Sequence, residues 1–209
     1  MLSRCAYIES ASKFRYLTLK LVLKPGKELV MKREEIIRLF PEINDIQDEN
    51  LRNGVIKVWI YFWEKSGFEN LEEAPFNPVV PGVSLVNHIK SVLHISLAIA
   101  EALERYHGIK VNRDRLIAAV LLHDVSKTVE YEHGKKSEIG KLFQHGFWGA
   151  HEAINFGLPV EIAHLIHTHP FNSPVEPAFL EGLILHYADF ADADSLRFNE
   201  GVEPYLFKK

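Results

Sequence analysis

An apolar run near the middle of this chain ends in an adjacent histidine and aspartate. Residues 116–122 are expected to form a buried helix, which leads directly to His123, Asp124 and, three residues further on, Lys127. A buried carboxylate needs a cation, a metal ion or several hydrogen-bond donors. His123 and Asp124 are both good ligands for a divalent metal, and Lys127 lies one helical turn from each. The alternative is an ordinary helix C-terminus, where His and Lys complement the helix dipole.

Other expected helices carry polar residues that could join this pair. His88 lies at the end of an apolar stripe with Val92 and Ile99, although a lone histidine there could also be part of the core. On the last long helix Asp189 lies within an apolar face, and Asp192 follows one turn later. The alternative is that these are solvated surface carboxylates, an interpretation that fits Asp192 better than Asp189.

Two histidines, on the expected helices between His123 and Asp189, are also placed to point inward. His145 lies near the start of an expected helix, with Gly149 one turn later to allow close packing. His169 shares a helical face with Ile162 and Ile166. Five expected helices therefore each bring a His or Asp to an end or face that should point inward. Ligands projected from neighbouring helices are how bundle proteins build metal sites.

Composition limits the classes of partner. The net charge is −4 and no Lys- or Arg-rich run is present, so a nucleic-acid polymer is not expected to bind. An anionic small molecule is still compatible, because a metal would supply local positive charge. Cys5 is the only cysteine, which excludes an internal disulfide. No apolar run has the length of a membrane span and no signal peptide is evident, so we expect a cytoplasmic protein without a membrane partner.

The pattern of periodicity predicts an all-α protein with an N-terminal extension. Residues 14–24 are ambiguous between strand and helix, and Pro25 and Gly26 mark a turn. Helices are expected at 31–40 and 48–65, and the second carries an aromatic stripe that should pack on the rest of the protein. Residues 72–83 contain three prolines and read as a linker-like loop. We therefore divide the chain into a mostly helical extension, 1–83, and a helical domain, 84–209.

No strand is required after residue 84. Ser84 and Asn112 are expected helix N-caps, and Gly108 is an expected stop. Further helices are expected at about 141–157, 159–169 and 177–198. The loop 170–174 follows His169 directly, and it either borders the site or only connects two helices. The extension could cover the cleft or form the contact of a homodimer.

The ordered set of these residues resembles the HD superfamily of metal-dependent phosphohydrolases, over about residues 84 to 198. Ser126 is a departure, since many members have glycine before the lysine. The matching motifs are Val86-Asn-His88-Ile-Lys-Ser-Val92, Ala118-Ala-Val-Leu-Leu-His123-Asp124-Val-Ser-Lys127, His145-Gly-Phe-Trp-Gly149-Ala, Val160-Glu-Ile-Ala-His-Leu-Ile166-His-Thr-His169 and His186-Tyr-Ala-Asp189.

The resemblance implies an HD-domain-like helical bundle and a set of site residues. The implied ligands of one divalent metal are His88, His123, Asp124 and Asp189. In two-metal members of the superfamily the counterparts of His145 and His169 are also ligands, so a second metal or a phosphate could bind there. Mixed imidazole and carboxylate ligation suits Mn, Fe, Co, Ni or Zn, with one or two ions per chain. The implied catalytic residues are Asp124 and Lys127, and the implied substrate-binding residues are Lys127, His145 and Asp192.

The resemblance implies hydrolysis of a phosphate ester by a metal-activated water, with a nucleotide or a related phosphorylated small molecule as the expected substrate. One alternative on the same fold is a mixed-valent di-iron oxygenase, which needs His145 and His169 as ligands. Another is a non-catalytic nucleotide-sensing module with a structural metal. The last is a helical domain with no site, in which Asp124 and Asp189 would both need other partners.

Overall fold

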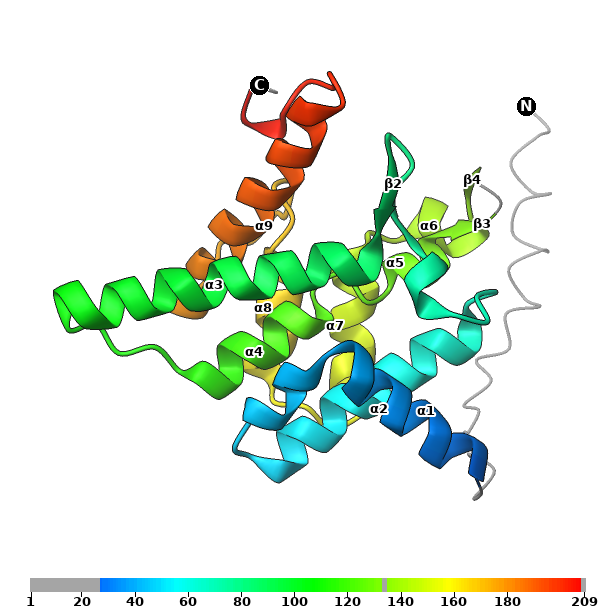
Figure 1. Ribbon diagram of the computed structural model, residues 1–209, viewed down its shortest axis with the longest axis horizontal. Coiled ribbons are helices and arrows are strands. Elements are labelled where there is room, and N and C mark those ends of the chain that lie inside the picture. The colour runs from blue at the N-terminus through cyan, green and yellow to red at the C-terminus, as the bar shows by residue number, and fades with distance from the viewer. Residues whose placement is uncertain (1–26, 133–134, 208–209) are drawn as a thin grey trace, which may run out of the picture.

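The computed structural model describes residues 27–132 and 135–207 (Figure 1). The ambiguous run at 14–24 and the turn at Pro25 and Gly26 lie outside the described residues. The α-helices are α1 (Lys27–Leu39), α2 (Glu49–Lys65), α3 (Leu85–His107), α4 (Arg113–Leu122), α5 (Lys127–Glu130), α6 (Glu138–Leu142), α7 (His145–Asn155), α8 (Val160–Thr168) and α9 (Leu180–Asn199). The 3-10 helices are η2 (Pro41–Asp45), η3 (Leu71–Glu73) and η4 (Tyr205–Phe207). None of the described helices is both long and apolar enough to cross a membrane.

Helix α3 is the long element that crosses the middle of the molecule in Figure 1, with α9 packed against it. The Ser84 hydroxyl accepts a hydrogen bond from the Asn87 amide at 3.2 Å, which caps the first turn. Gly108 ends the helix with a φ of +67°, a conformation that a residue with a Cβ rarely adopts. Asn112 caps α4 through the Arg115 amide at 2.9 Å. All three expected helix ends are confirmed.

Helices α7 and α8 form a closely packed pair. A Cβ built on Gly149 of α7 would lie 3.1 Å from Cγ2 of Ile166 in α8, so the absent side chain allows the approach. Helix α8 also packs on α4, which places the ends of α4, α7 and α8 around one region. The close packing expected at Gly149 is confirmed.

The N-terminal helices share a core with the helices that follow. One cluster of buried apolar residues runs from Ile36 in α1 to Ala188 in α9. Trp59 of α2 is fully buried against Phe40, and its indole N–H donates to the Leu121 carbonyl at 2.9 Å. That carbonyl belongs to the last turn of α4 and has no partner inside the helix. The expectation that the extension packs on the helical domain is confirmed.

Two short hairpins were not expected. Segment 72–83, read above as a loop, contains β1 (Pro75–Asn77) paired with β2 (Val80–Ser84). After residue 84, β3 (Tyr131–Glu132) pairs with β4 (Lys135–Lys136). Strands of two to five residues are too short to show a period of two, and prolines weaken the signal further. The fold is nonetheless mostly helical, as predicted.

Candidate metal centre

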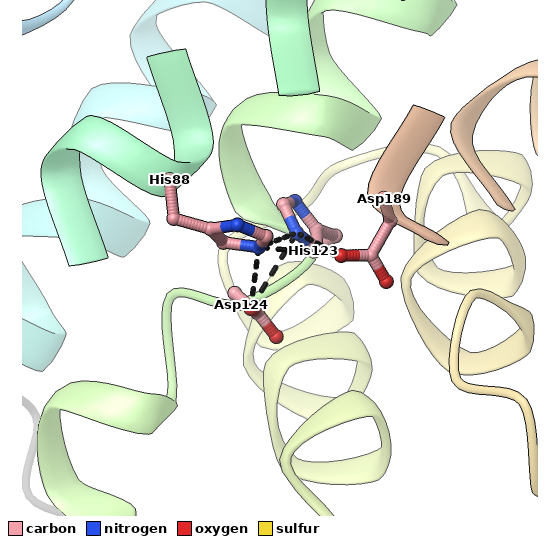
Figure 2. Close-up of side chains that lie close together, drawn as sticks. All are labelled: His88, His123, Asp124 and Asp189. Atoms are coloured by element: carbon pink, nitrogen blue, oxygen red, sulfur yellow. Dashed lines mark hydrogen bonds and ion pairs between the residues drawn. The ribbon is translucent and has the colours of Figure 1, made fainter. Parts of the chain in front are cut away.

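Four side chains from three elements converge at the middle of the helical domain (Figure 2). His88 comes from α3, Asp189 from α9, and His123 and Asp124 from the end of α4. Nε2 of His88 lies 3.2 Å from Oδ1 of Asp189, 3.3 Å from Oδ2 of Asp124 and 3.4 Å from Nε2 of His123. The four ligand atoms all lie within 4.8 Å of one another. Residues up to about a hundred positions apart in the sequence are therefore brought together, as the sequence indicated.

The end of α4 explains how adjacent residues face the same space. The regular helix ends at Leu122, and tight turns follow, in which the Val125 amide donates to the Leu122 carbonyl and the Lys127 amide to the Asp124 carbonyl. His123 and Asp124 are both fully buried. In a continuous helix, consecutive side chains point 100° apart around the axis. The irregular backbone after Leu122 instead lets the His123 and Asp124 side chains enter one cavity.

Fixed acceptors orient three of the imidazoles. The Nδ1–H groups donate at 2.7 Å, from His123 to the Val120 carbonyl, from His169 to the Ile166 carbonyl and from His88 to Oδ2 of Asp192. Each ring therefore directs Nε2 toward the cluster, the tautomer that suits metal ligation. Asp192 also accepts a hydrogen bond from the Ser91 hydroxyl.

The Asp124 carboxylate lies next to cationic and imidazole groups but accepts no aligned hydrogen bond from the described residues. Neither carboxylate oxygen accepts a hydrogen bond from any residue that the structure describes, although the side chain is buried. The Lys127 ammonium lies 2.6 Å from Oδ2 as an ion pair without hydrogen-bond alignment. Oδ1 faces Nε2 of His145 at 3.3 Å and Nε2 of His169 at 3.5 Å. Buried carboxylate oxygens in this position are costly unless a cation binds them, so the residues fit a metal ion.

Asp124 also belongs to a second cluster. Its carboxylate and the imidazoles of His145, at the start of α7, and His169, just after α8, offer three ligand atoms within 4.8 Å of one another. The two Nε2 atoms of these imidazoles are 3.2 Å apart. On the other side of the His145 ring, Oε2 of Glu130 lies 3.6 Å from Nδ1. Two His/Asp clusters therefore share one carboxylate, an arrangement consistent with divalent metal binding.

The electrostatics of the centre keep most ligands in the protonation state that a metal requires. Burial lowers the pKa of His123 to about 4 and holds the pKa of His145 well below its usual value, so both rings are neutral. Burial would raise the pKa of Asp124, but Lys127 and the neighbouring imidazoles outweigh it, and the pKa lies well below its usual value. His88 differs. Burial opposes its charge, but the carboxylates of Asp124, Asp189 and Asp192 raise its pKa to about 10.

A cavity of about 240 Å³ opens beside the two clusters. Lys127 reaches it, with Nζ 4.6 Å from the ring centre of Phe76. The Phe76 ring in turn stacks on the His88 imidazole at 3.9 Å. The residues that line the cavity are Phe76, Lys127, Glu130, Lys136, Gln144, His145, His169, Pro170, Phe171, Asn172, Asp189, Phe190, Ala193 and Tyr205.

Some residues around the site differ from what the sequence indicated. Asp192, expected to bind substrate, does not line the cavity and instead contacts His88 from behind. Glu130 was missed, although it follows Lys127 by one helical turn. Phe76 was also missed, and its proline-rich segment gives no signal. The loop 170–174, for which both roles were left open, borders the cavity with Pro170, Phe171 and Asn172.

Comparison with known proteins agrees with this geometry. The HD domain model matches residues 85–194, more than half of the chain, and the chain therefore belongs to the HD domain family. A curated relative, the dihydroneopterin 2′,3′-cyclic phosphate phosphodiesterase of Methanocaldococcus jannaschii, is 35% identical over 114 residues. The alignment covers 52% of this chain and 46% of the relative, so the chain spans about half the length of that protein. No solved structure matches the chain significantly.

Proposed function

We propose that this protein is an HD-type, metal-dependent phosphoric ester hydrolase, and that its substrate is a phosphodiester of a small molecule. The observation that carries the proposal is the Asp124 carboxylate, which is buried without a hydrogen bond from the described residues where two His/Asp clusters meet beside Lys127. Family membership supports the reaction class. The name of the relative supports a cyclic phosphate of a nucleotide-like or pterin-like compound as the first substrate to test.

In this proposal His88, His123, Asp124 and Asp189 hold one divalent ion. His145 and His169, with Asp124 shared, hold a second ion or a phosphate oxygen. When bound, such an ion lowers the pKa of a water molecule and polarises the phosphoryl group. Because the ligands mix imidazole with carboxylate, Mn, Fe, Co, Ni and Zn are the candidates, rather than Mg with its preference for oxygen.

The chain's own residues bind the ester and orient the reactants. Lys127 reaches the cavity from beside Asp124, so its ammonium can donate to a phosphate oxygen and stabilise the charge that develops there. Asp124 is assigned to orient the attacking water, and Asp189, with 15% of its side chain exposed, lies at the edge of the same space. The water oxygen forms a bond to phosphorus, the bond to the ester oxygen breaks, and that oxygen leaves with a proton.

The test combines metal analysis with a substrate panel. The protein as purified is analysed for its elements, and the metal-free protein is then reloaded with each candidate metal and assayed on phosphodiesters, 2′,3′-cyclic phosphates and phosphomonoesters. We expect metal-dependent hydrolysis that is lost in Asp124→Ala and kept in Glu138→Ala, a control whose side chain is 84% exposed. Absence of turnover on the whole panel with every metal would contradict the proposal.

The shared position of Asp124 also suits a mixed-valent di-iron oxygenase, which needs ligands for two irons. Metal analysis separates the two reactions, because the oxygenase requires two irons per chain and consumes dioxygen. Hydrolysis with a redox-inert ion such as Zn²⁺ would exclude a requirement for iron.

The division of the chain at residue 83 is likewise a proposal. The family match begins at residue 85, which supports a boundary close to this point. Phe76, however, lies before the boundary and lines the cavity. We propose that the extension supplies the floor of the site through Phe76.

A further inference from the structure

One side of the cavity consists of aromatic rings. Phe171, from the loop after α8, has 54% of its surface exposed and lies 5.2 Å from the Tyr205 ring, at an interplanar angle of 31°. Phe190 of α9 is half-buried and lies within 6.3 Å of the Phe171 ring centre. We call Phe171, Phe190 and Tyr205 the aromatic wall. Phe76 is only 3% exposed and already stacks on His88, so it contributes the floor of the cavity.

Contacts with α9 fix Tyr205, one ring of the aromatic wall, in place. The Asp194 carboxylate accepts hydrogen bonds from the backbone amides of Tyr205, at 2.5 Å, and Leu206, at 3.0 Å, which holds η4 against α9. The Arg197 guanidinium lies 4.4 Å from the Tyr205 ring centre. A ring that is already ordered loses little entropy on binding a ligand, so Tyr205 supports Phe171 as a surface that can stack against a planar group.

Two amide side chains reach the cavity beside the wall. Gln144, just before α7, and Asn172, next to Phe171, both line it. Neither side chain makes a hydrogen bond to another residue in the part of the chain that the structure describes. An amide offers a donor and an acceptor side by side, which matches the edge of a heterocycle that carries ring nitrogens and exocyclic oxygens or amines.

The charges that line the cavity limit how many phosphate groups a bound substrate can carry. The lysines among the described lining residues are Lys127 and Lys136, and each already faces a carboxylate, at 2.6 Å from Asp124 and 3.3 Å from Glu130. Apart from a metal, the cavity therefore has little positive charge in excess. A metal ion and Lys127 can together bind one phosphate group, whereas the further anionic groups of a polyphosphate would find no described lining lysine without a carboxylate partner. A single phosphate group matches the site better.

We propose that the aromatic wall, with Gln144 and Asn172, is the recognition site for one planar heteroaromatic ring, and that the substrate carries a single phosphate. This inference rests on the proposed phosphoester hydrolysis at the metal centre and adds the other half of the substrate. The ring stacks on Phe171 while its phosphate lies between Lys127 and the His/Asp clusters. The cavity volume of about 240 Å³ suits one compact ring system with a short linker to the phosphate.

Binding, measured separately from turnover, tests the inference. The metal-loaded full-length chain is titrated by calorimetry with guanosine 2′-monophosphate, which has the ring, and glycerol 2-phosphate, which lacks it. We expect the ring-bearing compound to bind at least about tenfold more tightly, the effect of one stacking interaction. Phe171→Ala should remove most of that ratio, and Phe171→Tyr should keep it. Phe198→Ala, which alters a 76% exposed ring outside the cavity lining, is the matched control and should keep the wild-type ratio.

Equal affinities for the two compounds in the wild type would overturn the inference, as would a Phe171→Ala variant with an undiminished ratio. Tighter binding of guanosine 5′-triphosphate than of the monophosphate would overturn the assignment of a single phosphate. The hydrolysis panel reports on the metal centre independently. Ring-dependent binding without any hydrolysis would contradict the proposed function but support the ring-binding site. Hydrolysis without ring preference would support the proposed function but contradict the ring-binding site.

Discussion

His88 makes contacts through both ring nitrogens, and the two sides have different consequences. Nε2 faces the carboxylates of Asp124 and Asp189, while Nδ1 donates to Asp192, which is itself held by the Ser91 hydroxyl. A carboxylate behind a ligating imidazole fixes the ring and raises its basicity. Asp192 is therefore a positioning residue in our interpretation, one step removed from the metal.

Replacing Asp192 by alanine should weaken metal binding about 10- to 100-fold, the usual cost of losing such a partner. The variant leaves the His88 Nδ1–H and the Ser91 hydroxyl without this acceptor. Affinity is measured by competition with a chromophoric chelator, and Asp192→Asn, which keeps an acceptor oxygen, should show a smaller loss. Glu200→Ala removes an exposed carboxylate after α9 and serves as the control. Wild-type affinity in Asp192→Ala would rule out the positioning role.

Metal binding should release about one proton per chain near neutral pH. The pKa of His88 is raised to about 10, so its extra proton is present below that pH and must leave before Nε2 can bind a cation. His123, with a pKa lowered to about 4, is already neutral and releases none. Affinity should therefore rise about tenfold per pH unit across the neutral range. Calorimetry in buffers of different ionisation enthalpy counts the protons, and a count of zero would contradict the charge assigned to His88.

At this scale the sequence predicted more of the metal centre than of the cavity around it. Imidazoles and carboxylates stand out within apolar helical faces, and the resemblance to the HD superfamily selected His88, His123, Asp124 and Asp189 from among them. Phe76 could not be named, since an aromatic residue in a proline-rich segment looks the same whether it covers a core or a site. The role of Asp192 depended on which side of His88 it occupies, and helical spacing does not determine that.

Helix α7 must approach α8 closely for His145 and His169 to face each other. Their Nε2 atoms are 3.2 Å apart, and the helices meet where Gly149 leaves room for Ile166. Small residues at helix contacts permit short interaxial distances. The geometry of the second His/Asp cluster therefore depends on a residue that carries no polar group.

Gly149→Val should destabilise the protein by about 1–3 kcal/mol, because the added atoms have to displace Ile166 in a packed interior. The free energy of unfolding is measured by urea titration. Gly67→Val is the control, since a Cβ at Gly67 would meet no atom within 4 Å. Equal stability of the two variants would show that α7 and α8 can separate without cost.

The helices were predictable because their ends carry chemical signals that act locally. Ser84, Gly108 and Asn112 cap or stop their helices through their own side chains or backbone freedom, whatever the tertiary structure. The expected helix at 141–157 is instead divided into α6 and α7 by extended backbone at Phe143 and Gln144. The hairpin β3–β4 was also not predicted, because four paired residues are too few to show the alternation of apolar and polar residues that indicates a strand.

Across the whole molecule, the candidate metal centre joins elements that are otherwise held by apolar packing. Ligand atoms come from α3, α9, the segment after α4, the start of α7 and the segment after α8. The Asp124 oxygens and the neighbouring nitrogens face one another at 3.3–3.5 Å, a spacing that a shared cation would bridge. A bound cation should therefore stabilise the fold as well as the chemistry.

Removing the metal with a chelator should lower the melting temperature, and adding metal back at a hundredfold excess over Kd should restore about 2.7 kcal/mol of stability. Differential scanning calorimetry measures both steps. Asp124→Ala should show a much smaller response to metal, because it loses the ligand common to both clusters. Identical melting of chelated and reloaded wild-type protein would indicate that no ion binds at this centre.

The Phe76 ring contacts both the His88 imidazole and the Lys127 ammonium, although it belongs to the hairpin that precedes the family match. The segment that matches the HD family and the segments that line the cavity are consequently not the same length of polypeptide. If homologues exchanged the segment before residue 85, the part of the cavity lined by Phe76 would be exchanged as well. Under the proposed function, substitutions before residue 85, outside the region that identifies the family, can therefore change which substrate this protein prefers.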